Sequence, residues 1–200
     1  FQTTMLSLPQ TIRWNSGELY FLDQTLLPHK VVEEKQETVE QVWDSIKQLK
    51  VRGAPAIGVA GAYGLLLAIR DKTGLHKNKF YELIKAKAAY LDSARPTAVN
   101  LKWALDRMLE YAKSFSGDDS KELFKYLEEE AIRIHNEDEQ LCLDIGKYGV
   151  SLIKKDMGVM THCNAGALAT TGIGTATAPM YLAHRKKINF RVYSSETRPL

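Results

Sequence analysis

The sequence predicts an α/β protein in which a mainly helical N-terminal domain with a small β-sheet is followed by the beginning of a parallel α/β domain. Apolar residues follow helical spacing over most of residues 38–155. Between residues 158 and 193 the pattern changes to strand, tight loop, small-residue helical segment and strand, which together form one βαβ unit. We place the two domains at residues 1–125 and 126–200.

The N-terminal segment is expected to form a β-hairpin. Residues 11–14 and 19–22 have strand-like composition and flank the turn sequence at residues 15–17 (Asn-Ser-Gly). The first helix is expected after Thr38, which can cap it, because Gln41 three residues later completes a capping box.

Further helices fill the rest of this domain. One begins near Pro55, because proline suits the first turn of a helix. Two others cover residues 79–91 and 97–114, the second capped by Thr97. Residues 115–120 then form a loop, with Asp119 or Ser120 as the cap of the helix that follows.

That next helical stretch, residues 121–155, is long and highly charged, and we expect it to break or kink at Asn136 and Gly146. Strands are then expected at residues 158–162 and 188–193, with a tight loop at residues 163–166 after the first strand and a helical segment at residues 167–187. Because a parallel sheet needs several βαβ units to cover both faces, we expect this chain to be a piece of a longer polypeptide.

Composition excludes several classes of protein. Hydrophobic residues make up 44% and charged residues 26%, which is ordinary for a globular chain. The net charge of +3 is too small to indicate nucleic-acid binding, and the apolar run at residues 56–69 is shorter than the roughly 20 residues of a membrane span. No signal peptide is visible, and two cysteines suit a reducing cytoplasm. We expect no cofactor and no metal.

The first candidate site is the sequence Arg52-Gly53-Ala54, directly before the helix that begins near Pro55. A helix N-terminus exposes N–H groups that attract anions, a glycine lets the backbone approach, and arginine contacts phosphate in a two-pronged way. The alternative is a plain entry loop into a buried helix, whose Gly58, Gly61 and Gly64 let a neighbour pack closely.

Arg95 and Cys163 are the other candidates. Arg95 also precedes a proline and a helix start, so the two arginines could surround one phosphorylated ligand; an exposed arginine at a helix entry is the alternative. Cys163 follows the carboxyl end of a strand, where ligands bind in parallel sheets. Cys163 could instead be a small buried residue. His162 points to the other face of the strand and is a poor partner for the thiol.

Residues near Cys163 are possible lining of the same cleft. Asn164 and Gly166 share its loop, and Glu196 and Arg198 follow the second strand at the same edge of the sheet. Cys142 is expected in the core beside Leu141 and Ile145. The glycines at residues 172 and 174 lack the spacing of a nucleotide loop.

Four segments together resemble the methylthioribose-1-phosphate isomerases of methionine salvage. They are VRGAPAIG, SARPTAVNL, HCNAGALATTGIGTA and SSETRPL, and they occur in the order of that family. The superfamily also holds ribose-1,5-bisphosphate isomerases and regulatory subunits of the eukaryotic initiation factor guanine-nucleotide exchange complex. The resemblance implies a helical domain followed by a Rossmann-like domain, and a homodimer.

It also implies an aldose–ketose isomerase that acts on a small phosphorylated sugar without a cofactor. Cys163 matches the cysteine proposed as an acid towards the ring oxygen, and Arg52, Gly53, Ala54 and Arg95 match phosphate-binding positions. The family's catalytic aspartate and a further glutamine would fall after Leu200. Ribose 1,5-bisphosphate as the substrate, and a non-catalytic regulatory subunit, stay open as alternatives. The residues do not decide between proton and hydride transfer.

Overall fold

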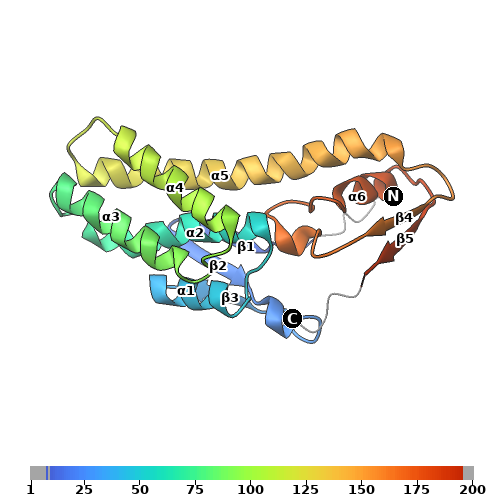
Figure 1. Ribbon diagram of the computed structural model, residues 1–200, viewed down its shortest axis with the longest axis horizontal. Helices are drawn as coiled ribbons and strands as arrows, with labels where there is room; N and C mark the ends of the chain where they lie inside the picture. The colour runs from blue at the N-terminus through green and yellow to red at the C-terminus, as the bar shows by residue number, and fades with distance from the viewer. Residues whose placement is uncertain (1–7, 9, 196–200) are drawn as a thin grey trace.

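The computed structural model describes residue 8 and residues 10–195. Helices α1 to α4 and a three-stranded sheet gather in one half of the molecule, and the strands β4 and β5 with α6 lie in the other (Figure 1). The long helix α5 runs along both halves. The architecture is the α/β fold that the sequence predicts, with a mostly helical first part.

The first part begins with an antiparallel sheet of order β1-β2-β3. Its strands are β1 (Ile12–Asn15), β2 (Glu18–Leu22) and β3 (Glu33–Gln36). Ser16 and Gly17 join β1 to β2 with φ angles of 50° and 82°, which suits the twist of a tight hairpin turn. The predicted hairpin is therefore confirmed, and β3 extends it.

Helix α1 (Val39–Lys47) begins at the predicted capping box. The backbone N–H of Gln41 donates to Oγ1 of Thr38 at 3.2 Å, and the Gln41 side chain accepts from the backbone N–H of Thr38 at 3.4 Å. These bonds satisfy N–H groups that a helix start leaves without partners.

Helix α2 (Ala54–Ile69) is buried on nearly all sides and packs against α1, α3 (Lys77–Asp92), α4 (Val99–Ser114) and α5. A Cβ atom at Gly58 would lie 2.9 Å from the carbonyl oxygen of Asn100, and one at Gly61 would lie 2.5 Å from Leu101. The glycines therefore allow a neighbouring helix to pack closely on α2. Such packing was the alternative to an anion site at this segment. These contacts also place the beginnings of α2 and α4 at the same end of the helix pair.

Two expectations about helix ends are wrong. Ala98, not Thr97, occupies the cap position of α4, and no side chain caps that helix. Helix α5 (Ser120–Gly149) is capped by Asp119, as one expectation had it, but runs without a break at Asn136 or Gly146. At Gly146 a Cβ atom would lie 2.9 Å from Leu182 of α6 (Ala178–Arg185), so this glycine allows two helices to approach and does not end α5.

The expected division at residues 125/126 falls inside α5. Leu123 and Leu127, on either side of it, belong to the main core with α2 and α4. Towards its C-terminal end, α5 packs against α6. One helix thus contributes to both parts of the chain, and the position of the domain boundary stays a prediction.

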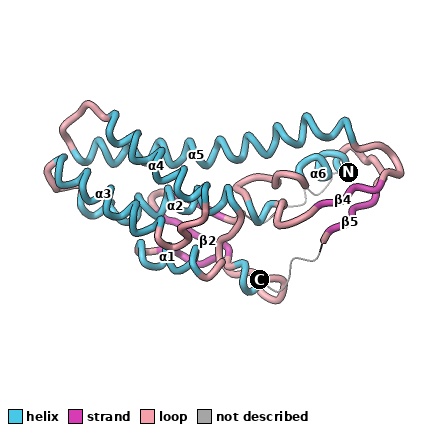
Figure 2. Tube along the Cα trace, viewed as in Figure 1, coloured by secondary structure: helices cyan, strands magenta, loops and turns pink. Residues whose placement is uncertain are grey.

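The second part contains the predicted βαβ unit. Strands β4 (Gly158–Thr161) and β5 (Arg191–Ser194) pair in parallel, and α6 connects them. The helical segment expected from residue 167 begins later than expected, because residues 163–177 form a long loop (Figure 2) with one short 3-10 helix, η4 (Ala167–Ala169), and α6 starts only at Ala178. Threonine side chains in this loop bond to its own backbone and so compete with helix formation.

No helix among the described residues has the length and apolar character that a membrane crossing would require.

Candidate active site

The Arg52-Gly53-Ala54 loop lies directly against the loop that follows Cys163. Gly53 has a φ of 97°, a conformation that favours glycine. A Cβ atom there would lie 2.4 Å from both Cα and Cβ of Ala169, which belongs to η4. The loop of the first candidate site therefore contacts the segment that follows Cys163, more than 100 residues later in the chain.

The start of α2 is suited to an anion. Its first turn holds no acidic residue, and no side chain caps it. The N–H groups of this first turn and the helix dipole therefore have no carboxylate of the first turn as a partner. Arg52 is partly buried, and within the described ranges its side chain forms no ion pair and its buried Nε has no hydrogen-bond partner.

Arg95 lies in the turn between α3 and α4. Its backbone N–H donates to the carbonyl of Asp92 at 3.2 Å, and its carbonyl accepts from Ala98 at 2.9 Å. Since α2 and α4 begin at the same end of their pair, the Arg95 turn and the Arg52 loop lie at that end together. The Arg95 side chain forms no ion pair within the part of the chain that is described.

Cys163 lies two residues after the end of β4, and its side chain is exposed. Its φ of 65° is uncommon for a residue other than glycine, and such backbone strain is concentrated at functional sites. His162 turns elsewhere, since its Nδ1 lies 3.1 Å from Oγ of Ser195 after β5. The thiol thus stands at the carboxyl end of a parallel strand without a histidine partner among the described residues.

Hydrogen bonds fix the loop around Asn164 and Gly166, which are both partly buried. The carbonyl of Ala165 accepts from the backbone N–H of Thr175 at 2.9 Å and from Oγ1 of Thr177 at 3.0 Å. Because the first α-helix after Cys163 is α6, which starts at Ala178, no α-helix N-terminus follows the thiol directly.

Residues from other elements anchor this loop, and sequence reasoning missed them. The backbone N–H and Oγ1 of Thr171 both donate to Asp138 on α5, each at 2.7 Å. Thr11 donates to the carbonyl of Ala167 at 2.9 Å, and Gln24 donates to that of Leu168 at 2.7 Å. Such long-range bonds leave no signal in one sequence apart from polar residues inside otherwise apolar segments.

Cys142 is buried as expected, with 1% of its surface exposed, and burial raises the pKa of its thiol. Its expected companions are not in the core, since Leu141 is 61% and Ile145 40% exposed. The reason is that α6 and the loop around Gly172 cover only the Cys142 side of α5. Glu196 and Arg198 lie outside the described residues.

An apolar hollow of 500 Å³ opens beside the first turn of α2. Pro55, Val59, Trp103, Leu141 and Thr175 are among its lining residues, so it touches both α2 and the loop after Cys163. No lysine or arginine lines it.

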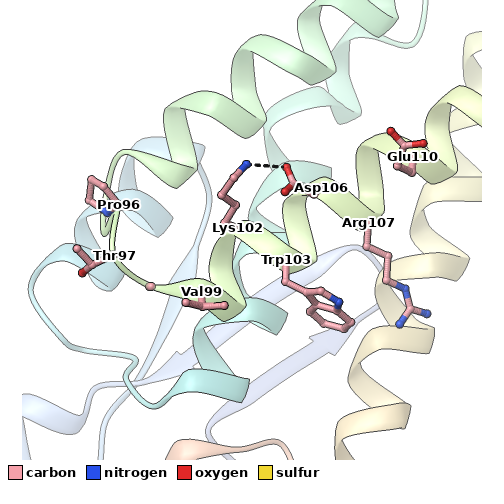
Figure 3. Close-up of a pocket in the computed structure, with 9 residues that line it drawn as sticks. Pro96, Thr97, Val99, Lys102, Trp103, Asp106, Arg107 and Glu110 are labelled. Carbon is pink, nitrogen blue, oxygen red and sulfur yellow. Dashed lines mark hydrogen bonds and ion pairs between the residues drawn. The ribbon is translucent and has the colours of Figure 1, made fainter.

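A second hollow, of 470 Å³, lies on the outer face of α4 (Figure 3). Its Lys102 and Asp106 pair with each other at 3.0 Å. Its Lys102 and Arg107 are thus engaged by carboxylates of the protein, unlike Arg52 and Arg95.

Residues 50–200 match the Initiation factor 2 subunit family. The chain belongs to this family. The match includes Arg52, Gly53, Ala54, Arg95 and Cys163. Members and neighbours of the family carry different names, which distinguish enzymes from translation factors.

Several relatives are named as isomerases. A 5-deoxyribose 1-phosphate isomerase of Clostridium botulinum (strain Loch Maree / Type A3) is 52% identical over 190 residues, which cover 94% of this chain and 54% of that protein. One of Bacillus thuringiensis (strain Al Hakam) is 50% identical over 188 residues, with the same coverage. The chain therefore spans about half the length of these relatives.

Solved structures of the family share the fold. The 5-methylthioribose 1-phosphate isomerase of Pyrococcus horikoshii has a TM-score of 0.86 at 30% identity, covering 94% of this chain and 60% of that one. The eIF-2B subunit delta of A. fulgidus has a TM-score of 0.84 at 38% identity, covering 96% and 56%. Structural likeness alone does not separate the two functions.

Proposed function

We propose that the protein carrying this chain is an aldose–ketose isomerase whose substrate is a pentose 1-phosphate with an apolar group at C5. 5-Deoxyribose 1-phosphate is the first candidate, by similarity to the relatives of that name, and 5-methylthioribose 1-phosphate is the second. The observation that carries the proposal is the exposed Cys163 in a loop that packs directly on the Gly53 loop at the start of α2.

The phosphate group would bind at the start of α2. The N–H groups of the first turn supply hydrogen bonds, and Arg52 and Arg95 supply two guanidinium groups that no carboxylate engages within the described residues. Gly53 and Ala54 present backbone without a large side chain in the way. The site would thus recognise the phosphate group at C1 of the sugar.

The chemistry would begin with opening of the ring. An aldose whose anomeric oxygen carries phosphate does not open spontaneously to an aldehyde, so the enzyme must protonate the ring oxygen as the ring bond breaks. Cys163 is the proton donor in this proposal. Hydrogen then moves from C2 to C1 and the C2 hydroxyl loses its proton, so that C2 becomes a carbonyl and a ketose 1-phosphate results. The proton lost from this hydroxyl balances the one that Cys163 donates. Substrate and product are isomers, so the reaction needs no external oxidant or reductant.

The hollow beside Pro55 and Thr175 supports an apolar C5 group over a second phosphate. Its lining includes Val59, Trp103 and Leu141, and it includes Glu137 but no cationic side chain. A methyl or methylthio group gains free energy from burial against such a surface. A phosphate placed there would lack a cationic partner and would face a carboxylate.

A non-catalytic subunit is the second candidate, favoured by the 38% identity to the A. fulgidus eIF-2B subunit delta. A subunit of that kind needs the fold but no reactive thiol beside an anion site. A cytoplasmic homodimer, which the resemblance implies, is part of the proposal for either function.

The deciding experiment is to assay the full-length protein with three sugars. They are 5-deoxyribose 1-phosphate, 5-methylthioribose 1-phosphate and ribose 1,5-bisphosphate. We expect kcat/KM for both 5-substituted sugars to exceed that for the bisphosphate by at least about tenfold, which corresponds to about 1.4 kcal/mol. Absence of turnover with all three would favour the non-catalytic subunit.

A further inference from the structure

Gln24 lies between the two loops of the proposed site. It begins the short 3-10 helix η1 (Gln24–Leu26), directly after β2 and Asp23. Only 4% of its surface is exposed. A glutamine is seldom buried so completely unless its amide makes a specific hydrogen bond.

Gln24 bonds to both loops at once. Its backbone N–H donates to the carbonyl of Lys50 at 3.0 Å, two residues before Arg52. Its side-chain Nε2 donates to the carbonyl of Leu168 at 2.7 Å, five residues after Cys163. A single residue therefore joins the segment that carries the proposed phosphate site to the segment that carries the thiol.

The two loops pack tightly against each other. Gly53 and Ala169 approach so closely that a Cβ atom at Gly53 would overlap Ala169. A shift of Leu168 relative to Lys50 would change this contact and, with it, the distance from the phosphate site to Cys163. A hydrogen bond of 2.7 Å from a buried amide resists that shift, because losing it would leave a buried carbonyl without its partner.

We propose that Gln24 is a positioning residue that sets the spacing between the Arg52-Gly53 loop and Cys163, so that one sugar phosphate reaches both. The inference rests on the proposed function for its consequence in catalysis. Gln24 acts through the two loops and does not itself carry out chemistry. Its removal should therefore lower kcat more than it raises KM, since each loop keeps its own binding groups.

The first test compares two variants of the full-length protein. Gln24→Met keeps the size of the side chain and removes the bond to Leu168. Thr11→Val is the matched control, since it removes a buried bond of 2.9 Å to the same short helix but does not touch the Lys50 segment. We expect Gln24→Met to lower kcat by about 10- to 100-fold, the scale of a misplacement near 1 Å. KM should change less than about threefold, and Thr11→Val should stay near wild type in both.

A second measurement does not depend on turnover. Cys163 is exposed and Cys142 is buried, so iodoacetamide should alkylate Cys163 first. Saturating inorganic phosphate should slow this alkylation in the wild type and in Thr11→Val, but not in Gln24→Met. If no sugar phosphate is turned over, the proposed function fails while this measurement still decides the role of Gln24.

Several results would overturn the inference. One is a kcat in Gln24→Met close to that of the wild type. Another is an equal loss of kcat in Thr11→Val, which would indicate general loosening of the loop. The third is equal protection by phosphate in all variants, or no protection in the wild type.

If Gln24→Met does not fold, Gln24→Glu replaces it, because its carboxylate has the same shape and no N–H donor. If neither variant folds while Thr11→Val does, Gln24 serves the fold alone, and the inference is wrong.

Discussion

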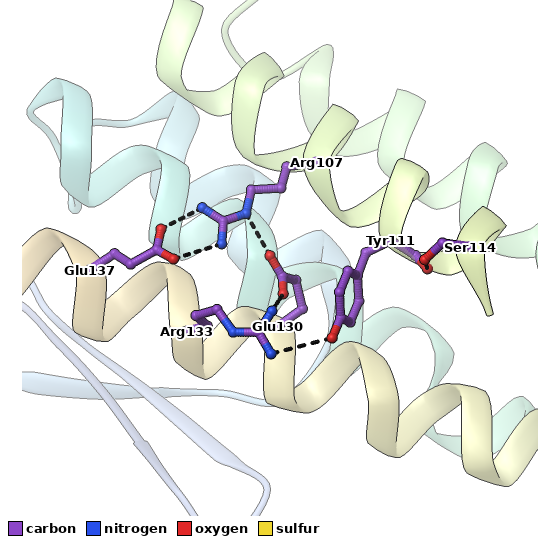
Figure 4. A network of polar contacts seen from close by, with 6 residues as sticks. All are labelled: Arg107, Tyr111, Ser114, Glu130, Arg133 and Glu137. Atoms are coloured by element: carbon purple, nitrogen blue, oxygen red, sulfur yellow. Dashed lines mark hydrogen bonds and ion pairs between the residues drawn. The ribbon is translucent and has the colours of Figure 1, made fainter.

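Two arginines in this chain have opposite surroundings. Arg107 on α4 bonds to Glu130 and Glu137 on α5, and Glu130 also pairs with Arg133 (Figure 4). Arg52, at the start of α2, has no ion pair within the described residues. Both side chains are partly buried, so solvent exposure does not explain why only Arg107 forms ion pairs.

The Arg107 network stabilises the packing of α4 on α5. Glu130 is only 2% exposed, and its charge is tolerated because two guanidinium groups surround it. The same bonds raise the pKa of Arg107 and lower that of Glu137. An arginine that is paired with carboxylates of its own chain stabilises the fold, whereas an arginine without a carboxylate partner is available to bind a ligand. The predictions below test that distinction, in order of expected effect.

The largest effect is expected at Cys163. Replacing it by alanine should lower kcat of the full-length protein by about 10²- to 10⁴-fold, because a positioned proton donor typically contributes that much. Cys142→Ala is the matched control and should keep nearly the wild-type kcat, since this thiol is buried in the core. Steady-state kinetics with 5-deoxyribose 1-phosphate measures both, and the opposite ranking would identify Cys142 as the functional thiol.

A smaller effect should separate the arginines directly. Arg107→Met should lower the free energy of unfolding by about 1–3 kcal/mol, because Glu130 would keep only Arg133 as its partner. Arg52→Met and Arg95→Met should leave stability within about 0.5 kcal/mol. They should instead weaken phosphate binding by about 1.5–3 kcal/mol each. Urea unfolding and calorimetric titration measure the two quantities. Equal destabilisation by Arg52→Met would contradict the comparison.

The smallest effect concerns His135 on α5, whose Nδ1 lies 3.2 Å from the hydroxyl of Tyr63. Burial lowers the pKa of His135, although Asp138 and Glu139 act in the opposite direction. The unfolded chain therefore binds a proton more readily than the folded protein does. Stability should be greatest above the unfolded pKa of about 6.5 and should decline as the pH falls below it. The decline should be smaller in His135→Gln; unfolding curves between about pH 7 and pH 5 that superimpose for the two proteins would refute this.

Local sequence patterns predicted the fold well where a single local signal, such as a helix cap or a turn, decides the structure. Thr38 and Gln41 gave the start of α1, and the turn at residues 15–17 gave the hairpin. The glycines of α2 were correctly connected with close packing. The failures lie where distant contacts override local preference: Gly146 allows α6 to approach instead of ending α5, and the segment before α6 forms a loop instead of a helix.

The candidate site was predictable in its residue types but not in its assembly. Arg52, Arg95 and Cys163 stand out because each precedes or follows a regular element at a place where ligands bind. The contact of Gly53 with Ala169 and the bond of Gln24 to Leu168 join residues that are more than 100 positions apart. A single sequence carries no record of such pairs, so their discovery required the structure.

The continuity of α5 limits how the two halves of the molecule can move. Thirty residues of α-helix form a rod about 45 Å long, which bends little over a few turns. A hinge at residues 125/126 would break this rod and separate Leu123 and Leu127 from the same core. The helix therefore acts as a fixed frame that opposes a hinge between the main core and α6, since both pack on it.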